Sequence, residues 1–264
     1  MQVCIQSVGL VGPGLDGWAC ARSIFAGQDL YRLKPTPQLI PDILASTERR
    51  RSSDVARLAI AAAQEALRSS GLAGDQVATV FTSSDGDGRI TDQICAALAR
   101  LEREISPTSF HNSVHNAPAG YWSIATGSQL ASTNVCAYDL SFAAGLLEAA
   151  AQTIVEHQPV MLIASDLPFP VPLHAFRPVE HSFAAAILMT PSAAKTSLMR
   201  WDIGFEPSRP ATSYPEELPR SLYSNPAARC LPLLATLARG KTETVSLDYL
   251  DDDRSLVISC EPVV

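Results

Sequence analysis

Positive charge is scarce in this sequence of 264 residues, where 20 Lys and Arg residues stand against 27 Asp and Glu residues. The formal net charge is −7 at pH 7. A field of this sign repels polyphosphates, so the overall charge argues against nucleic acid as a partner. Charged residues make up only 18% of the chain and hydrophobic residues 47%. This composition excludes a disordered chain and is compatible with a large apolar face covered by a partner.

The usual patterns of metal-binding and disulfide-bonded proteins are also missing. The six cysteines contain no Cys-x-x-Cys pair and are scattered as Cys4, Cys20, Cys95, Cys136, Cys230 and Cys260. His111 and His115 have the spacing of one helix face, but the glutamate of a zincin motif is absent. The loop 83–88 lacks the later oxygen ligands of a calcium site. We therefore expect free thiols and no metal.

Long apolar runs are absent as well. The longest, residues 142–155, carries Glu148 and is too short to cross a bilayer. The first ten residues, MQVCIQSVGL, have no basic residue ahead of their apolar stretch, which argues against a signal peptide. These absences predict a cytoplasmic protein without a membrane span, and free thiols fit a reducing compartment.

What is present is an alternation of predicted strands and helices in one domain, residues 1–264. The strands are expected at 3–11, 76–82, 132–138, 159–165 and 182–191. The helices are expected at 16–27, 55–70, 89–104, 117–126 and 141–156. The helix 55–70 is the clearest, because Ser53 or a neighbouring residue can cap its start and Gly71 can end it. The order indicates an α/β fold with helices on both faces of a sheet.

The last part of the chain, residues 196–264, has a weaker pattern. Residues 206–233 contain six prolines and predict an extended, irregular segment. Residues 243–251 and 255–264 have the pattern of a hairpin at the edge of a sheet. The sequence assigns no role to residues 200–264.

Residues 12–17 match the pattern G-x-G-x-x-G between a predicted strand and a predicted helix. A dinucleotide site also needs a second strand that ends in an acidic residue about 20 residues later. Residues 28–42 do not have the pattern of a strand. We therefore favour a plain strand-to-helix turn over a cofactor site, and we expect no cofactor.

Cys136 is the natural candidate for a nucleophile. It lies within the predicted strand 132–138 without a glycine beside it, and Asp139 would oppose a thiolate at the helix start. A buried structural cysteine is the favoured interpretation. The alternative is an independent acyltransferase or thioesterase-like enzyme that uses Cys136. Arg49, Arg50 and Arg51 are either a solvated run or a docking patch for an acidic acyl carrier protein.

Several segments taken together resemble the N-terminal half of the β-ketoacyl synthases, which have a thiolase-like fold. The resemblance covers residues 1–195, and it is specific because the matching segments occur in the family's order and at the family's spacing. It is carried by IQSVGLVGP (5–13), RLAIAAAQEAL (57–67) with Gly71-Leu72, FTSS (81–84), VHNA (114–117) and FAAAIL (183–188). It implies a half-fold in which helices cover a mixed sheet.

The departures from that family are informative. In active members the cysteine nucleophile lies in a turn that corresponds to the region near Asp139, within about one residue, and Cys136 comes about three residues too early. The two histidine motifs of the family's C-terminal half are absent from this chain. Decarboxylative condensation needs the thiolate to hold the acyl group and the histidines to stabilise the enolate. The resemblance therefore implies a chain without that chemistry.

A ketosynthase-like chain with a degenerate nucleophile resembles a chain length factor of aryl polyene-type clusters. Such a subunit pairs with an active ketosynthase, shapes its acyl tunnel and meets acyl carrier protein indirectly. The resemblance implies that interface or tunnel-wall positions are His115, Asn116, Tyr121, Trp122, Ile124, Thr133 and Val135. Bulky Tyr121 or Trp122 is expected to set the tunnel depth. A small carrier-binding scaffold is a further alternative.

Overall fold

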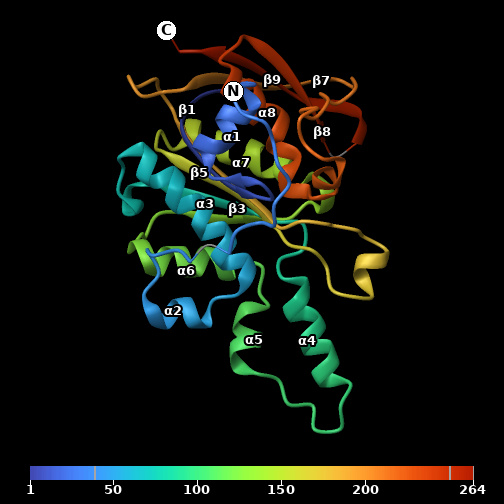
Figure 1. Ribbon diagram of the computed structural model, residues 1–264. Coiled ribbons are helices and arrows are strands. Elements are labelled where there is room, and N and C mark those ends of the chain that lie inside the picture. Colours follow the sequence, from blue (N-terminus) through green and yellow to red (C-terminus); the bar gives the residue numbers. More distant parts are fainter. Residues whose placement is uncertain (39, 250, 264) are drawn as a thin grey trace.

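The computed structural model describes residues 1–38, 40–249 and 251–263, in which nine strands form one mixed sheet (Figure 1). The strands are β1 (Gln2–Gly12), β2 (Leu15–Asp16), β3 (Ala78–Thr82), β4 (Ser132–Val135), β5 (Val160–Asp166), β6 (Phe183–Thr190), β7 (Met199–Pro207), β8 (Glu243–Tyr249) and β9 (Asp251–Pro262). Their order is β4-β3-β5-β6-β1-β7-β9-β8, and β2 pairs with β1. β3 is parallel to β4 and β5, whereas the other neighbours are antiparallel.

Helices cover both faces of this sheet, as the sequence predicts (Figure 1). They are α1 (Trp18–Phe25), α2 (Ser46–Arg51), α3 (Asp54–Ser70), α4 (Gly88–Leu98), α5 (Pro107–Asn112), α6 (Ala117–Thr126), α7 (Ser141–Val155) and α8 (Leu231–Arg239). One core cluster joins the sheet to α1, α7 and α8, and a second joins it to α3 and α6. Strand β5 contributes to both, because Val160 and Leu162 lie in the first cluster and Met161 and Ile163 in the second.

Helix α3 confirms the sequence prediction at both ends. Ser53 accepts a hydrogen bond from the backbone N–H of Ala56 at 3.3 Å, and Gly71 has the left-handed φ of 73° that ends a helix. The helix packs directly on β1 at Gly9, where an added Cβ would lie 2.0 Å from the carbonyl oxygen of Ala62. A side chain at position 9 would therefore push α3 away from the sheet.

The glycine-rich segment after β1 is a tight hairpin into β2, not a phosphate-binding turn. Gly14 has a φ of +64°, which favours glycine. The N-terminus of α1 is already occupied by a carboxylate of the same chain. Glu65 accepts hydrogen bonds from the backbone N–H groups of Leu10, at 2.8 Å, and Trp18, at 2.6 Å. An internal anion thus fills the place where a pyrophosphate would bind.

The C-terminal part is more regular than the prolines predict. The β8–β9 hairpin confirms the expected edge hairpin. Residues 208–219 are irregular as expected, but strand β7 and helix α8, which overlap the two ends of the segment 206–233, were not predicted. Pro232 stands in the first turn of α8, where its missing N–H is tolerated. Leu231 and Leu234 lie in the same core cluster as Leu146 of α7. Residues 199–262 therefore extend the sheet and cover α7.

Two further elements are shorter than predicted, and three short ones, α2, α5 and β2, were not predicted. Helix α4 ends at Leu98 instead of residue 104, and strand β4 ends at Val135 instead of residue 138. Helices α4 and α5 project from the body as an arm in Figure 1. No side chain of α4 is buried, so this helix is not part of the core that packs on the sheet.

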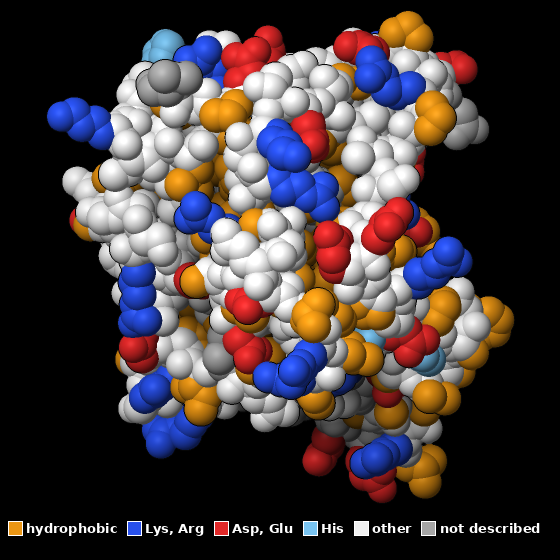
Figure 2. All heavy atoms as spheres, turned by 45° about the horizontal axis from the view of Figure 1, so that its top comes forward, with side chains coloured by type: hydrophobic (Ala, Val, Ile, Leu, Met, Phe, Trp, Pro, Cys, Tyr) orange, Lys and Arg blue, Asp and Glu red, His pale blue; other side chains and the backbone are white. Residues whose placement is uncertain are grey.

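The surface carries charges of both signs. Figure 2 shows basic and acidic side chains interspersed over the face that it presents. Across the three described ranges, no helix is both long and apolar enough to span a bilayer.

Candidate functional site at the elbow between β4 and α7

The connection from β4 to α7 forms a sharp elbow with Tyr138 at its tip. Tyr138 has a φ of +53°, a left-handed conformation that costs a non-glycine residue roughly 1 to 2 kcal/mol. Ser141 holds this turn by donating to the carbonyl oxygen of Tyr138 at 2.6 Å and accepting from the N–H of Ala137 at 3.0 Å. Enzymes use such strand–turn–helix elbows to present a nucleophile at the start of a helix. The elbow thus forms here without the glycine that sequence reasoning required.

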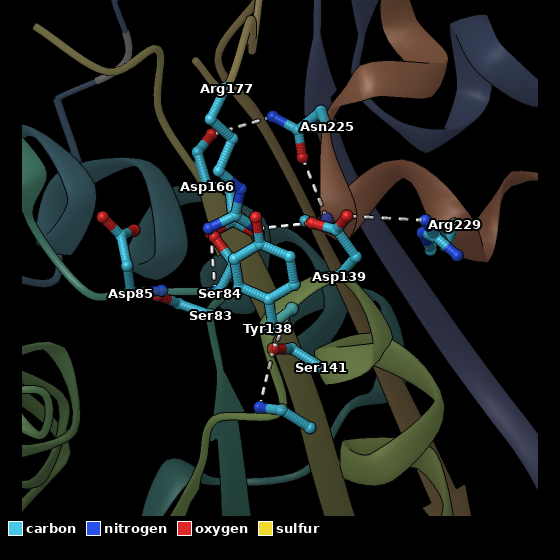
Figure 3. Close-up of polar contacts among 12 residues, drawn as sticks. Ser83, Ser84, Asp85, Tyr138, Asp139, Ser141, Asp166, Arg177, Asn225 and Arg229 are labelled. Atoms are coloured by element: carbon cyan, nitrogen blue, oxygen red, sulfur yellow. Dashed lines mark hydrogen bonds and ion pairs between the residues drawn. The ribbon is translucent and has the colours of Figure 1, made fainter. Parts of the chain in front are cut away.

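Asp139, the residue after the tip, is held in an ion-pair network (Figure 3). Arg177 donates to one of its carboxylate oxygens, and Arg229 lies 4.0 Å from the other. Arg229 also lies 3.6 Å from the carboxylate of Asp248 on β8. The carboxylate therefore joins the elbow to the β5–β6 connection and to the C-terminal segment. It lies in the region where active relatives are expected to carry the nucleophile.

The guanidinium of Arg177 is stacked on aromatic rings as well as paired. It lies 3.8 Å from the ring centroid of Tyr138 and 5.0 Å from that of Phe169. Only 13% of the Arg177 side chain is exposed. A cation between rings and next to a carboxylate gains from all three contacts. Arg177 thus packs against Tyr138, the residue at the tip of the elbow.

A second carboxyl group near the elbow belongs to Asp166, which ends β5 and is buried. One of its oxygens accepts from the backbone N–H and the hydroxyl of Ser84, at 2.8 and 2.7 Å. The other oxygen is buried and has no hydrogen-bond partner among the described residues. Burial raises the pKa of Asp166 to about 7, against the lowering effect of the Ser84 hydrogen bonds. Burial thus favours the protonated form of this carboxyl group, in contrast to an exposed aspartate.

The structure corrects the expectation of a buried Cys136. Because β4 is the edge strand and ends at Val135, Cys136 lies beyond it and is exposed. Its thiol donates to the carbonyl oxygen of Ser84 at 3.0 Å. Among the described residues no histidine side chain makes a hydrogen bond with Cys136. The alternative of an enzyme that uses Cys136 as its nucleophile would need a base beside the thiol, and no histidine is hydrogen-bonded to it among the described residues.

The expected interface and tunnel-wall residues fall into two groups. Ile124 is 65% exposed, and Thr133 and Val135 are half-buried on edge strand β4. By contrast, Tyr121 and Trp122 are 2% and 1% exposed. They lie in the core cluster that joins α6 to α3, so their side chains do not reach the surface of this chain.

His115 and Asn116 lie at the start of α6. Asn116 is exposed. The Nε2 atom of His115 lies 3.5 Å from the carbonyl oxygen of Ser83, in the loop that also contacts Asp166 and Cys136. The structure therefore brings His115 close to the elbow, although nothing in the sequence spacing predicts it.

The arginine run forms the last turns of α2. Arg49 and Arg50 line a cavity of about 670 Å³, together with Arg57 and Arg89, whereas Arg51 is exposed outside this lining. Asp54 pairs with both Arg57 and Arg89. Within the described part of the chain, the guanidinium groups of Arg49 and Arg50 have no hydrogen bond or ion pair. The cavity is thus a local positive site on an acidic protein.

Sequence reasoning missed Arg177, Arg229, Asp166 and Asn225. Asp166 ends a predicted buried strand, and a charged residue at that position is a signal that could have drawn attention to it. Arg177 and Arg229 lie 38 and 90 residues from Asp139 along the chain. Asn225 donates hydrogen bonds to the carbonyl oxygens of Asp166 and His181, which lie 59 and 44 residues away, and no local pattern indicates such contacts.

Comparisons with known proteins agree with this geometry. Residues 29–246 match the family described as Beta-ketoacyl synthase, N-terminal domain. A chain of the Xenorhabdus doucetiae complex between the ketosynthase ApeO and its chain length factor ApeC is 24% identical, with a TM-score of 0.72, and the match covers 98% of this chain and 99% of that chain. No curated protein sequence matches significantly.

Two further solved structures match from end to end. A chain of the ishigamide ketosynthase/chain length factor has 13% identity and a TM-score of 0.73 and is covered completely, as is this chain. A chain of AntDE:AntF, an acyl carrier protein of a type II polyketide synthase in complex with its ketosynthase bound to the hexaketide, has 12% identity, a TM-score of 0.73 and 99% coverage of both chains. These likenesses confirm the predicted ketosynthase half-fold. Because residues 29–246 are most of its length, the chain belongs to the β-ketoacyl synthase N-terminal domain family.

Proposed function

We propose that this chain is a non-catalytic chain length factor, which pairs with an active β-ketoacyl synthase and shapes its acyl tunnel in polyketide biosynthesis of the aryl polyene type. The elbow between β4 and α7 is the main support for this proposal. The backbone forms a sharp turn there, but Tyr138 stands at its tip and Asp139 is ion-paired with Arg177. This arrangement offers no nucleophile for an acyl group.

The local charges also oppose condensation chemistry. A carboxylate next to the elbow destabilises a thiolate at the start of α7. The thiol of the exposed Cys136 donates a hydrogen bond to a backbone carbonyl oxygen, and no imidazole among the described residues is hydrogen-bonded to it. Acyl transfer needs an activated thiolate and a group that stabilises the enolate. Both are expected from the partner subunit.

The surface around β4 supports pairing with another subunit. Among the described strands, β4 pairs only with β3, so its outer edge is free. Sixteen large apolar side chains are exposed among the described residues, and nine of these lie in residues 98–138 and 171–176. Such a concentration of apolar surface is typical of an interface. We assign Ile124, Thr133 and Val135 to the contact with the ketosynthase.

The other positions that the family resemblance indicates are not assigned to direct contact with the ketosynthase. His115 and Asn116 lie at the rim of this surface, at the start of α6. Tyr121 and Trp122 are buried behind α6, so we assign them to fixing that helix. A bulky residue there sets tunnel depth through the position of α6, since a packed core does not yield easily.

Pairing is tested by co-expressing this chain with each catalytically complete ketosynthase of the same genome. We expect one of them to co-purify with this chain in equal amounts through size-exclusion chromatography, because the free β4 edge and its apolar surroundings need a cover. A chain that remains a stable monomer beside every such ketosynthase would contradict the proposal.

We also propose that the cavity at Arg49 and Arg50 receives the acidic surface of an acyl carrier protein. The double substitution Arg49→Glu and Arg50→Glu should weaken binding of the carrier to the complex roughly tenfold at low salt, since two unpaired cations are reversed. Isothermal titration measures the change. The matched control, Lys195→Glu with Lys241→Glu, changes the net charge by the same amount at exposed sites. Equal losses of affinity in both variants would show that overall charge causes the effect and would contradict docking at this cavity.

A further inference from the structure

The connection between β5 and β6, residues 167–182, is a loop with a closed base. Asp166 and Phe183, at its two ends, are paired in the sheet. The side-chain amide of Asn225 donates to the carbonyl oxygens of Asp166, at 3.1 Å, and of His181, at 2.8 Å. Asn225 is completely buried. One residue of the C-terminal segment therefore fastens both ends of the loop.

The loop is also held further along its length. Phe169 and Val179 are 7% and 1% exposed and anchor its two arms. Between them, Arg177 is fixed to the elbow by Asp139 and by the ring of Tyr138 (Figure 3). These contacts leave only the part from residue 170 to residue 176 outside the anchored region.

Composition makes this loop stiff. Four of its 16 residues are proline, at positions 168, 170, 172 and 178. Proline fixes φ and lowers the number of conformations that the free chain can adopt. A loop that is rigid before binding loses little conformational entropy when it is buried by a partner.

The tip of the loop is apolar and faces water. Val171 is 82% exposed, Phe176 is 84% exposed and Leu173 is 44% exposed. The charged residues of the loop are Arg177, which is already paired, and Glu180 beyond it. A rigid, uncharged and apolar projection has the properties of an anchor that fills a pocket in another protein.

We propose that residues 167–182 are a preformed proline finger, whose apolar tip docks into the active ketosynthase subunit, with Arg177 as the positioning residue that sets its direction. The inference rests on the proposed function and deepens it. Arg177 joins the finger to the elbow that follows β4, so the finger continues the surface assigned to the ketosynthase. The tip has no lysine or arginine, and His174 is its only basic side chain, which makes an acidic carrier protein a poor occupant.

The direct test replaces the tip and measures affinity in the complex. Val171→Ser with Phe176→Ser should raise the Kd for the ketosynthase about tenfold or more, because two anchor side chains are lost. The two side chains are exposed in the free chain, so its Tm should stay within about 2 °C of the wild-type value. Leu30→Ser with Leu33→Ser is the matched control, since these are also exposed apolar residues, and it should leave the Kd unchanged.

Two failures are distinguishable. If the wild-type chain binds no ketosynthase, the proposed function falls and the finger proposal falls with it. If the wild type binds and the tip variant binds equally well, only the finger proposal is overturned.

A photo-cross-link identifies the occupant. Benzophenone-alanine at position 176, incorporated in the co-expressed complex, should yield one product with the combined mass of the two subunits. A product of twice the mass of this chain, a product with acyl carrier protein, or no product would overturn the assignment.

The positioning role of Arg177 is tested by a double-mutant cycle on the same Kd. Asp139→Asn and Arg177→Ala should each weaken binding roughly threefold to tenfold, and the double variant should be no weaker than the worse single variant, because both break one contact. A purely structural role would lower Tm in each variant but leave the Kd unchanged, and that result would contradict the claim.

Discussion

Replacing Trp122 by alanine is expected to lower the free energy of unfolding by about 3 to 5 kcal/mol. The side chain is 1% exposed and lies in the cluster between α6 and α3. Its removal leaves a cavity that the short α6 cannot close, because Pro118 and Gly127 fix the two ends of that helix. Urea unfolding followed by far-ultraviolet circular dichroism measures the loss.

The control for this variant lies two residues further along the same helix. Ile124→Ala removes an apolar side chain that is 65% exposed, so its effect on the isolated chain should stay within about 0.5 kcal/mol. In the ketosynthase complex the order reverses for affinity, because Ile124 belongs to the proposed contact surface and Trp122 does not. Equal stability losses for the two variants would refute the assignment of their positions.

The second large effect concerns pH and the buried carboxyl group of Asp166. Burial raises its pKa from 3.8 to about 7, so between these values the unfolded chain releases a proton that the folded chain keeps. The stability contributed by this group is therefore fully present below pH 4 and is lost as the pH rises towards 7. The total loss is on the order of 4 kcal/mol, at 1.36 kcal/mol for each pKa unit.

Asp166→Asn should abolish this part of the pH dependence. The amide oxygen can still accept from Ser84, and no charge has to form in the core. Unfolding at pH 5.5 and pH 8 should show that the variant gains about 2 kcal/mol relative to wild type between these two values. Asp92→Asn, which removes an exposed carboxylate, provides the control and should show no such gain. A parallel pH profile for wild type and Asp166→Asn would contradict the raised pKa.

Local signals predict much of the fold. Ser53 and Gly71 mark the ends of α3, and the predicted helix 117–126 has the bounds of α6 because Pro118 and Gly127 enclose it. The continuous apolar run of 183–190 identifies β6 as a central strand. In the C-terminal part this reasoning fails at α8, a short helix after a proline-rich segment, which packs on α1 and β8.

The candidate site could be predicted only in part. The resemblance indicated a turn near Asp139, and the structure has a left-handed residue one position earlier, at Tyr138. It could not indicate that Arg177 covers the tip, or that Asn225 closes the base of the loop, because these contacts join segments far apart in the chain. The burial of Tyr121 and Trp122 also depends on which face of α6 meets α3, and the weakly amphipathic sequence of α6 does not determine that face.

In the proposed function this chain supports condensation without carrying an acyl group. The most direct measurement is intact-protein mass spectrometry of the co-purified complex after incubation with an acyl-loaded carrier protein. We expect an acyl adduct on the ketosynthase subunit and an unchanged mass for this chain. An acyl adduct on this chain that is lost in Cys136→Ser would contradict the account and identify Cys136 as a nucleophile.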